Sequence, residues 1–171
     1  GTGKTYWGAR MIHYLLQQGK RVGITSQGWN GIKNLYDTVI ELLEDDSYKT
    51  IYGGQRGVSY NKFPPEGERT GEYYRSGDQL VAWSTHFWAA LGNAEFKSEQ
   101  EKQNHKFDYL FIDEAGQVSL YDALVASLGA RNVVLLGDSQ QLPQVTKGSH
   151  EFGAGASILE HITDEVPTIQ Q

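Results

Sequence analysis

The first residues of the chain have the composition of a phosphate-binding turn. Two glycines flank a threonine and are followed by a lysine and a second hydroxyl, in the order Gly1-Thr2-Gly3-Lys4-Thr5. This order matches the second half of the pattern G-x-x-x-x-G-K-[ST], in which backbone amides and a helix N-terminus surround phosphate oxygens. In such a turn Lys4 would bind the β- and γ-phosphates of a nucleotide, and the Thr5 hydroxyl would ligate Mg²⁺. The alternative is a glycine-rich terminus before an ordinary helix.

Two adjacent carboxylates, Asp113 and Glu114, follow an apolar run that is typical of a buried strand. Ligands of open α/β sheets bind at the carboxyl ends of the strands, so we expect this pair beside the phosphates. Asp113 would hold Mg²⁺, largely through its water shell, and Glu114 would orient and deprotonate the attacking water. The alternative is a solvated acidic turn that caps the following helix. Together with the phosphate-binding turn, the pair indicates ATP hydrolysis.

A third segment narrows the class of ATPase. Residues 137–145 read G-D-S-Q-Q-L-P-Q-V and closely resemble the G-D-x-x-Q-L-P-P-V segment of superfamily 1 helicases. The resemblance implies that Gln141 senses the γ-phosphate, and that this segment couples the ATP site to a bound strand. Residues 113–117, D-E-A-G-Q, resemble the D-E-A-x-Q box of superfamily 1B, in the branch with the nonsense-mediated-decay helicase and nuclease-linked helicases. The alternative is a simple turn after a strand at 137–138.

Three segments are further similar to bacterial helicase regions that lie behind a RecB-like nuclease domain in one polypeptide. They are residues 107–118, 131–145 and 148–161. The resemblance covers essentially the whole chain and implies a P-loop NTPase fold, the first RecA-like domain (1A) of the motor, with ATP and Mg²⁺ as ligands. It also implies a second RecA-like domain in the same polypeptide and, in the nuclease-linked members, an N-terminal RecB-like nuclease domain.

Polar residues after two other predicted strands are candidates for contact with nucleic acid. Residues 25–30 resemble the family's motif Ia, and Thr85 stands where the family has a second strand-contacting segment. Hydroxyls, amides and helix N-termini suit contacts to phosphates, and a tryptophan can stack on a base. The candidates are Ser26, Gln27, Trp29, Asn30 and Thr85. The alternatives are helix capping by Ser26 or Asn30 and, favoured for Trp29 alone, a place in the core.

The elements that must position these residues alternate along the chain. Apolar spacing predicts helices at residues 4–18, 30–43, 85–91 and 121–128. Short apolar runs predict strands at 21–26, 79–84, 109–113 and 133–138. This alternation predicts a doubly wound, RecA-like parallel sheet with helices on both faces, whose first strand and start of the P-loop are missing. The continuous apolar runs of the last two strands indicate central positions.

One partial domain, residues 1–171, is expected, with a loop-rich insertion at about 47–78. The insertion mixes tyrosines, cations and glutamates, so a solvated loop is favoured over a strand-binding loop.

A formal net charge of -6 excludes nucleic-acid binding through bulk positive charge, so contacts must be local. The absence of cysteine excludes disulfides, and scattered histidines such as His86 indicate no metal site of the protein's own. No export or membrane-spanning segment is present, so we expect a cytoplasmic protein without a membrane partner.

The sequence therefore predicts the ATP-binding motor domain of a superfamily 1 helicase, which translocates on and unwinds nucleic acid in the full-length protein. DNA is favoured over RNA as the single-stranded partner. The resemblance implies that arginines from the second domain complete the site, and an arginine finger contributes about 10³ to 10⁵ in rate. Little or no turnover is expected from this fragment alone. Two alternatives stay open: a non-helicase P-loop ATPase of the AAA+ kind, and a nucleic-acid-binding module that has lost catalysis.

Overall fold

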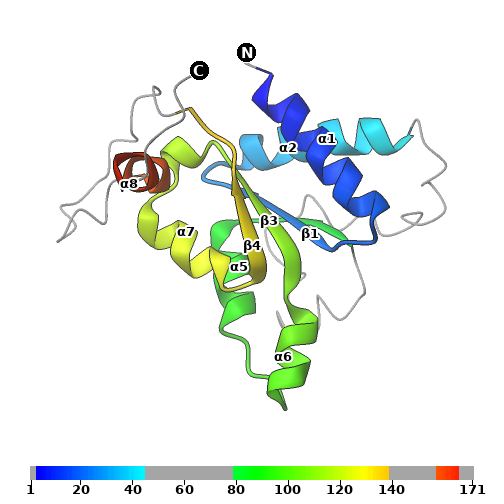
Figure 1. The fold of residues 1–171 in the computed structure, drawn as a ribbon, viewed down its shortest axis with the longest axis vertical. Helices are drawn as coiled ribbons and strands as arrows, with labels where there is room; N and C mark the ends of the chain where they lie inside the picture. Colours follow the sequence, from blue (N-terminus) through cyan, green and yellow to red (C-terminus); the bar gives the residue numbers. More distant parts are fainter. Residues whose placement is uncertain (1–2, 45–78, 139–156, 166–171) are drawn as a thin grey trace.

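The chain forms a four-stranded parallel sheet between two layers of helices (Figure 1). The computed structural model describes residues 3–44, 79–138 and 157–165. The strands are β1 (Val22–Ser26), β2 (Leu80–Ala82), β3 (Phe107–Asp113) and β4 (Ala130–Leu135). They are paired in the order β2-β1-β3-β4, and every pairing is parallel. The predicted α/β fold, a P-loop NTPase-like sheet with helices, is confirmed.

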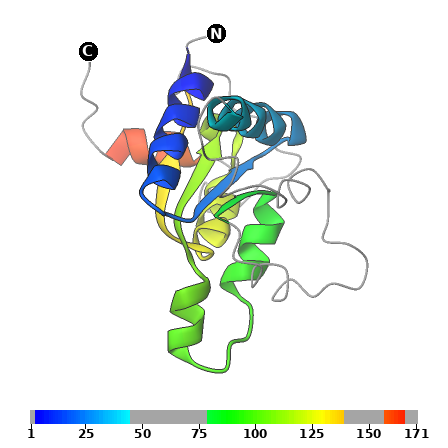
Figure 2. The same ribbon diagram turned by 90° about the vertical axis from the view of Figure 1, so that its right-hand side faces the viewer.

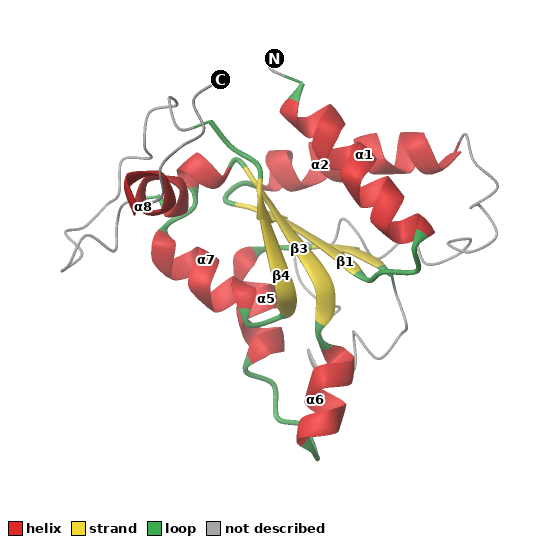
Figure 3. Ribbon diagram, viewed as in Figure 1, coloured by secondary structure: helices red, strands yellow, loops and turns green. Residues whose placement is uncertain are grey.

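Helices cover both faces of this sheet, as the two views at right angles show (Figure 2). The helices are α1 (Lys4–Gln17), α2 (Trp29–Glu44), α5 (Thr85–Gly92), α6 (Glu99–His105), α7 (Leu120–Ser127) and α8 (Ile158–Glu165). A short 3-10 helix, η3 (Ala115–Gln117), follows β3. Helices α1 and α2 pack together on one face, α5 and α7 pack together on the other, and α8 lies against η3 and α7. Because the strands are parallel, the loops after β1, β3 and β4 meet at one edge of the sheet (Figure 3).

The continuous apolar run of β3 serves two separate cores. Leu110 and Ile112 belong to the cluster formed with α5 and α7, whereas Phe111 between them belongs to the cluster formed with α1 and α2. Successive side chains of a strand point to opposite faces, so a strand covered on both sides must be apolar at every position. On the α5 side, buried Trp88 donates its indole N–H to the Ile24 carbonyl at 3.2 Å. A Cβ at Gly23 would lie 2.4 Å from the Trp88 ring, so the glycine permits this close packing.

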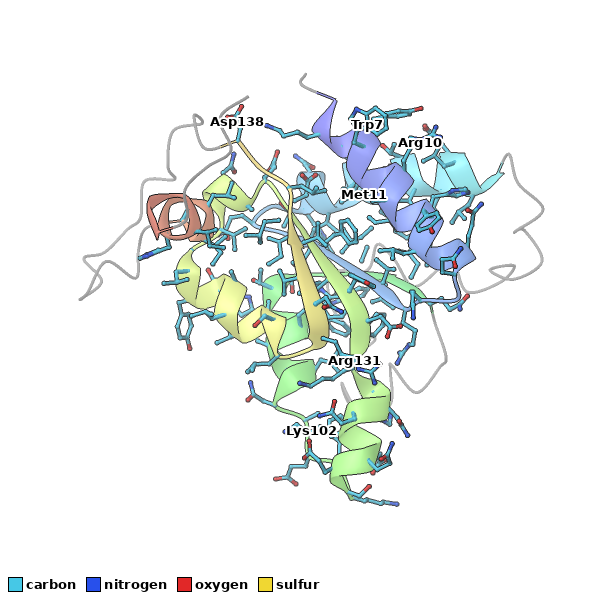
Figure 4. All side chains as sticks on the ribbon, viewed as in Figure 1. Trp7, Arg10, Met11, Lys102, Arg131 and Asp138 are labelled. Carbon is cyan, nitrogen blue, oxygen red and sulfur yellow. The ribbon has the colours of Figure 1, made fainter. Side chains whose placement is uncertain are left out.

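Helix α1 packs on the sheet through two small and two aliphatic residues, whereas its aromatic residues and its methionine face outward. Gly8, Ala9, Ile12 and Leu16 are buried, whereas Trp7, Met11 and Tyr14 are 63%, 43% and 60% exposed. Figure 4 shows Trp7 and Met11 on the outer side of α1. A Cβ at Gly8 would lie 2.4 Å from Leu136 Cδ1, so the glycine lets α1 approach the end of β4 without displacing that side chain. The spacing of Trp7, Met11 and Tyr14 indicated the helix correctly but does not mark its buried face.

Most predicted elements are confirmed within one to three residues. The strand predicted at 133–138 is β4, which begins at Ala130; it is the outer one of the described strands on its side of the sheet, with Arg131, Asn132 and Val133 exposed. The polar stretch 97–106 contains α6, which has no buried residue and therefore no apolar periodicity to reveal it. The insertion at 47–78 lies outside the described residues. Within the described ranges, no helix combines the length and apolar character that crossing a membrane requires.

Candidate nucleotide site

The start of α1 has the backbone geometry of an anion-binding turn. Gly3 occupies the N-cap position in the left-handed conformation, with φ 70°, and no side chain caps the helix there. The first amides of a helix have no intrahelical acceptor, so they face the turn with free hydrogens and partial positive charge. Lys4 and Thr5 lie half-buried in this first turn. Gly1 and Thr2, also predicted to bind phosphate, lie outside the described residues.

A carboxylate that sequence reasoning did not select, Asp138, meets Lys4 across this edge. Lys4 Nζ lies 3.5 Å from Asp138 Oδ2, and both side chains are about one-third exposed. Asp138 follows β4 by three residues, and Figure 4 shows it beyond the end of that strand, toward the start of α1. A signal was available, because Asp138 ends an apolar run just as Asp113 does.

The predicted carboxylate pair lies at the same edge, and its two members differ in environment. Asp113 is 5% exposed, and its Oδ1 accepts the Glu114 N–H at 2.9 Å. Burial raises the pKa of the Asp113 carboxyl, and nearby Glu114 raises it further, while the Glu114 N–H and the charge of Lys4 act against this rise. Glu114 is exposed and adopts φ 52° and ψ 41°, a left-handed conformation that costs a non-glycine residue of order 1–3 kcal/mol.

The alternative reading of this pair, a solvated acidic cap, is wrong. Asp113 is buried rather than solvated, and Glu114 makes no side-chain cap of η3. The turn is instead fixed by the neighbouring strand, because Ala115 donates its N–H to the Leu136 carbonyl at 2.9 Å, and Leu136 in turn donates to Ile112 at 2.9 Å. These bonds hold the residues after β3 and those after β4 together, which brings both strand-end carboxylates to one side of the sheet.

The donors at this edge fit a magnesium ion held mainly by phosphates and water. Asp113 offers a buried carboxylate whose charge is disfavoured by burial, and Thr5 offers a hydroxyl in the first turn of α1. In the parts of the chain that the structure describes, no group of three or more His, Cys, Asp or Glu side chains could hold a metal ion. Magnesium typically uses one or two protein carboxylates together with substrate phosphates, so the sparse set is the expected one.

A separate pocket of about 530 Å³ opens beside the N-termini of α2 and α5. We call it the hydroxyl pocket; its lining residues are Ser26, Gln27, Trp29, Ile32, Ser84, Thr85, His86 and Asp122. Ser26 Oγ is buried and has no hydrogen-bond partner among the described residues. Ser84 occupies the N-cap position of α5 without making a side-chain cap. The pocket therefore combines two helix N-termini with hydroxyls that are available to a ligand.

Four of the five residues predicted to contact nucleic acid line this pocket. Ser26, Gln27, Trp29 and Thr85 line it, whereas Asn30 is exposed and does not. The alternative of helix capping by Ser26 is wrong, because its hydroxyl makes no hydrogen bond within the described part of the chain. Trp29 fits both readings: it packs edge-to-face on buried Trp83, with ring centroids 6.0 Å apart, and it also lines the pocket.

His86 was not selected from the sequence but lines the same pocket, exposed at its surface. Its isolation from other potential metal ligands gave no sequence signal for this position. Gln141, the predicted γ-phosphate sensor, lies in 139–156, outside the described residues.

The described residues form an α/β fold like that of P-loop NTPases, and the first turn of α1 lies at the same edge of the sheet as the strand-end residues Asp113 and Asp138. Residues 91–149 match a family model described as an AAA domain. The chain is 28% identical over 149 residues to the DNA replication ATP-dependent helicase/nuclease DNA2 of Saccharomyces cerevisiae, an alignment that covers 86% of this chain and 10% of that protein.

A second relative is the DNA replication ATP-dependent helicase/nuclease JHS1 of Arabidopsis thaliana. It is 36% identical over 66 residues, which cover 37% of this chain and 5% of that protein. The chain therefore spans a tenth or less of the length of these curated relatives.

Proposed function

We propose that this chain is the ATP-binding domain of a superfamily 1 helicase motor. The proposal rests on the position of Lys4, in the first turn of α1, close to two carboxylates at the strand ends. Lys4 Nζ lies 3.5 Å from Asp138 Oδ2, and the positive charge of Lys4 acts to lower the pKa of buried Asp113. A lysine at a helix N-terminus opposite a buried carboxylate is the arrangement that a magnesium nucleotide requires. The similarity to two helicase/nucleases supports a motor rather than another ATPase.

In the proposed reaction, water attacks the γ-phosphate of ATP in line, and ADP and phosphate leave. The amides at the start of α1 and the Lys4 ammonium bind the phosphates and stabilise their charge. Asp113 and Thr5 would hold Mg²⁺, which neutralises phosphate charge when bound. Glu114, exposed at the edge of the sheet, orients the water and accepts its proton. Gln141 is proposed to contact the γ-phosphate.

The hydroxyl pocket is proposed to bind the backbone of a single strand. Its free hydroxyls and two helix N-termini suit phosphate oxygens without net positive charge, in keeping with the chain's formal charge of -6. Ser26, Gln27 and Thr85 would contact phosphates, Asn30 would do so from outside the pocket, and Trp29 would contact a base. DNA is favoured over RNA, since the names of both relatives refer to DNA replication.

The full-length protein is proposed to couple ATP hydrolysis to translocation and unwinding. This function needs a second RecA-like domain, whose arginines complete the site, and the relatives' names suggest an attached nuclease domain, for which a RecB-like fold is our proposal. The isolated chain is therefore proposed to bind Mg·ATP weakly and to turn it over little.

The test compares the isolated chain with the full-length protein. The isolated chain should bind a fluorescent ATP analogue in the presence of Mg²⁺ and hydrolyse ATP below about 1 s⁻¹, the lower end of typical enzyme rates. The full-length protein should hydrolyse ATP faster when single-stranded DNA is added, and the Gln141→Ala variant should lose that stimulation. An ATP hydrolysis rate that does not change on addition of single-stranded DNA would favour a non-helicase ATPase. Absence of nucleotide binding would favour a nucleic-acid-binding module that has lost catalysis.

A further inference from the structure

The hydroxyl pocket contains a group that a site for phosphate alone would not have. Among the described residues that line the pocket, Asp122 is the one that carries a carboxylate. Like charges repel, so a strand phosphate is disfavoured beside it. The phosphate is favoured instead beside Ser84 and Thr85 at the start of α5, and near Ser26, whose buried hydroxyl has no hydrogen-bond partner among the described residues. The Asp122 side of the pocket is therefore suited to a different part of a nucleotide.

Asp122 is oriented by the cap of its own helix and retains acceptor capacity. Ser119, the N-cap residue of α7, donates its hydroxyl to Asp122 Oδ2 at 2.9 Å and accepts the Asp122 N–H at 3.0 Å. An ionised carboxylate has two oxygens and about four acceptor sites, so the Ser119 hydroxyl leaves room for a donor from a ligand. Half-buried Asp122 therefore offers the pocket an acceptor whose direction is already set.

The pocket also has an aromatic wall. Trp29, the first residue of α2, is half-buried and packs edge-to-face on buried Trp83, with ring centroids 6.0 Å apart. This contact restrains the Trp29 ring, and buried Ile32 lines the pocket from the same helix. An aromatic ring can stack on any base, because every base has a π-face. The volume of about 530 Å³ is typical of pockets for small ligands, so a base can enter together with its phosphate.

We propose that the pocket holds one whole nucleotide of a single strand, and that Asp122 selects for a base with an exocyclic amine. The phosphate lies at the start of α5, the base lies against Trp29, and the amine donates to the Asp122 carboxylate. Cytosine has such a donor at N4, whereas thymine and uracil have a carbonyl oxygen at that position, which the carboxylate repels. This inference rests on the proposed function.

Oligodeoxycytidylate and oligodeoxyuridylate of equal length are a matched pair of probes. Where cytosine has the amine, uracil has a carbonyl, and neither base has the methyl group of thymine. The experiment measures the affinity of the full-length protein for each fluorescein-labelled probe by anisotropy, without nucleotide, at neutral pH and fixed salt. The wild type should bind the cytosine probe about tenfold more tightly, the lower end of what a hydrogen bond to a charged group contributes, because Asp122 is half-buried.

Asp122→Asn tests the residue and retains the cap of α7. The asparagine carbonyl can still accept the Ser119 hydroxyl, and its amide then presents hydrogens that suit the uracil carbonyl. The variant should therefore lose the preference for the cytosine probe or invert it. The matched control is Glu41→Gln, which also removes one negative charge, from an exposed site on α2 outside the pocket, and should retain the full preference. Thermal melts check that both variants are folded.

Trp29→Leu separates stacking from selection of the base. Leucine retains an apolar side chain against Trp83 but has no ring to stack, so the affinity for both probes should fall by the same factor, about tenfold. Unchanged affinity would place the base elsewhere and overturn the inference.

Two further outcomes would overturn the inference and leave the proposed function standing. One is equal affinity of the wild type for the cytosine and uracil probes. The other is a preference for cytosine that survives in Asp122→Asn, which would place the selection at another residue. Failure of the wild type to bind either probe would overturn both the inference and the proposed binding of a single strand.

Discussion

At the amino end of the sheet, Asp108 accepts the Arg21 N–H at 2.9 Å and an Arg131 guanidinium N–H at 3.0 Å, and its own carbonyl accepts from Asn132 at 2.9 Å. At the carboxyl end, Thr25 and Ser26 keep buried hydroxyls without partners among the described residues. Asp113 is buried there with a raised pKa, and Glu114 is held in a left-handed conformation.

The two ends are built from the same strands, yet among the described residues the buried side-chain groups without a hydrogen-bond partner lie at the carboxyl end. Arg21 illustrates the satisfied end: its guanidinium donates to the carbonyls of Asn104 and His105, each at 3.3 Å, and lies 4.2 Å from the Phe107 ring centroid. Such bonds stabilise a fold and leave nothing for a ligand. Unsatisfied groups cost stability and persist where a ligand completes them. Substitutions at the amino end should therefore change stability, and those at the carboxyl end should change binding.

The largest expected effect is loss of nucleotide binding in Lys4→Ala. Lys4 would contribute a positive charge to the phosphate turn, and a hydrogen bond to a charged group contributes about 1.5–3 kcal/mol, or about 10- to 100-fold in affinity. Titration with a fluorescent ATP analogue and Mg²⁺ measures the loss. The control is Lys20→Ala, an exposed lysine just beyond the other end of α1. If the two variants bound the ATP analogue with equal affinity, Lys4 would not be part of the nucleotide site.

The second effect is loss of stability without loss of binding, in Asp108→Ala. The substitution leaves the Arg21 N–H and the Arg131 guanidinium without this acceptor, and an unsatisfied partner costs about 1–3 kcal/mol. Each kcal/mol lowers Tm by about 2–4 °C in a domain of this size. Asp37→Ala, which removes an exposed i,i+4 pair with Lys33, should cost only about 0.3–0.5 kcal/mol. A marked drop in nucleotide affinity for Asp108→Ala would contradict the contrast between the two ends.

The third effect has the opposite sign: Asp113→Asn should stabilise the ligand-free protein. Because burial raises the pKa of Asp113, the folded state retains a proton in a pH range where the unfolded chain has released it. The free energy of unfolding therefore falls as pH rises through that range, which starts near 3.8, the ordinary pKa of an aspartate. Removing the charge should raise Tm by about 2–4 °C at pH 7, equivalent to about 1 kcal/mol.

Two comparisons test the cause of this gain. The stabilisation by Asp113→Asn should disappear as the pH falls below 3.8, because the wild-type carboxyl is then protonated in both states. Mg·ATP should raise the Tm of the wild type more than that of the variant, which lacks the carboxylate. A Tm for Asp113→Asn below that of the wild type at pH 7 would show that the carboxylate is already compensated in the ligand-free protein.

Sequence reasoning located the carboxyl end better than the amino end, for physical reasons. Lys4, Asp113 and Glu114 stand in short local patterns, because one turn or one strand end positions each of them. Asp138 was missed as a partner of Lys4, since this contact depends on how α1 lies over the end of β4.

Elements of the fold were likewise predicted where a local sequence pattern marks them. Strands and most helices were predicted, because apolar periodicity marks whatever packs on the sheet. Helix α6 has no buried residue, so no apolar pattern indicated it, although Ser98 caps it by accepting the Glu101 N–H at 3.1 Å. The pairing order of the described strands was not predicted, since it is a property of the whole sheet rather than of one segment.

The smallest effect tests whether the amino end depends on charge or on geometry, and Arg131→Lys separates the two. Arg131 donates to Asp108 at 3.0 Å and, through its other terminal nitrogen, to the Gln103 carbonyl at 2.7 Å. Lysine retains the charge but cannot donate in both directions from a planar fork. The side chain is 46% exposed, so solvent screens the ion pair, and the loss should be about 0.2–1 kcal/mol. If geometry carries the interaction, the difference in Tm between wild type and Arg131→Lys should persist in 1 M NaCl, where the Debye length is about 3 Å. If the difference disappears in salt, the Arg131 interaction depends on charge rather than on geometry, and the satisfied network would be weaker than its hydrogen bonds suggest.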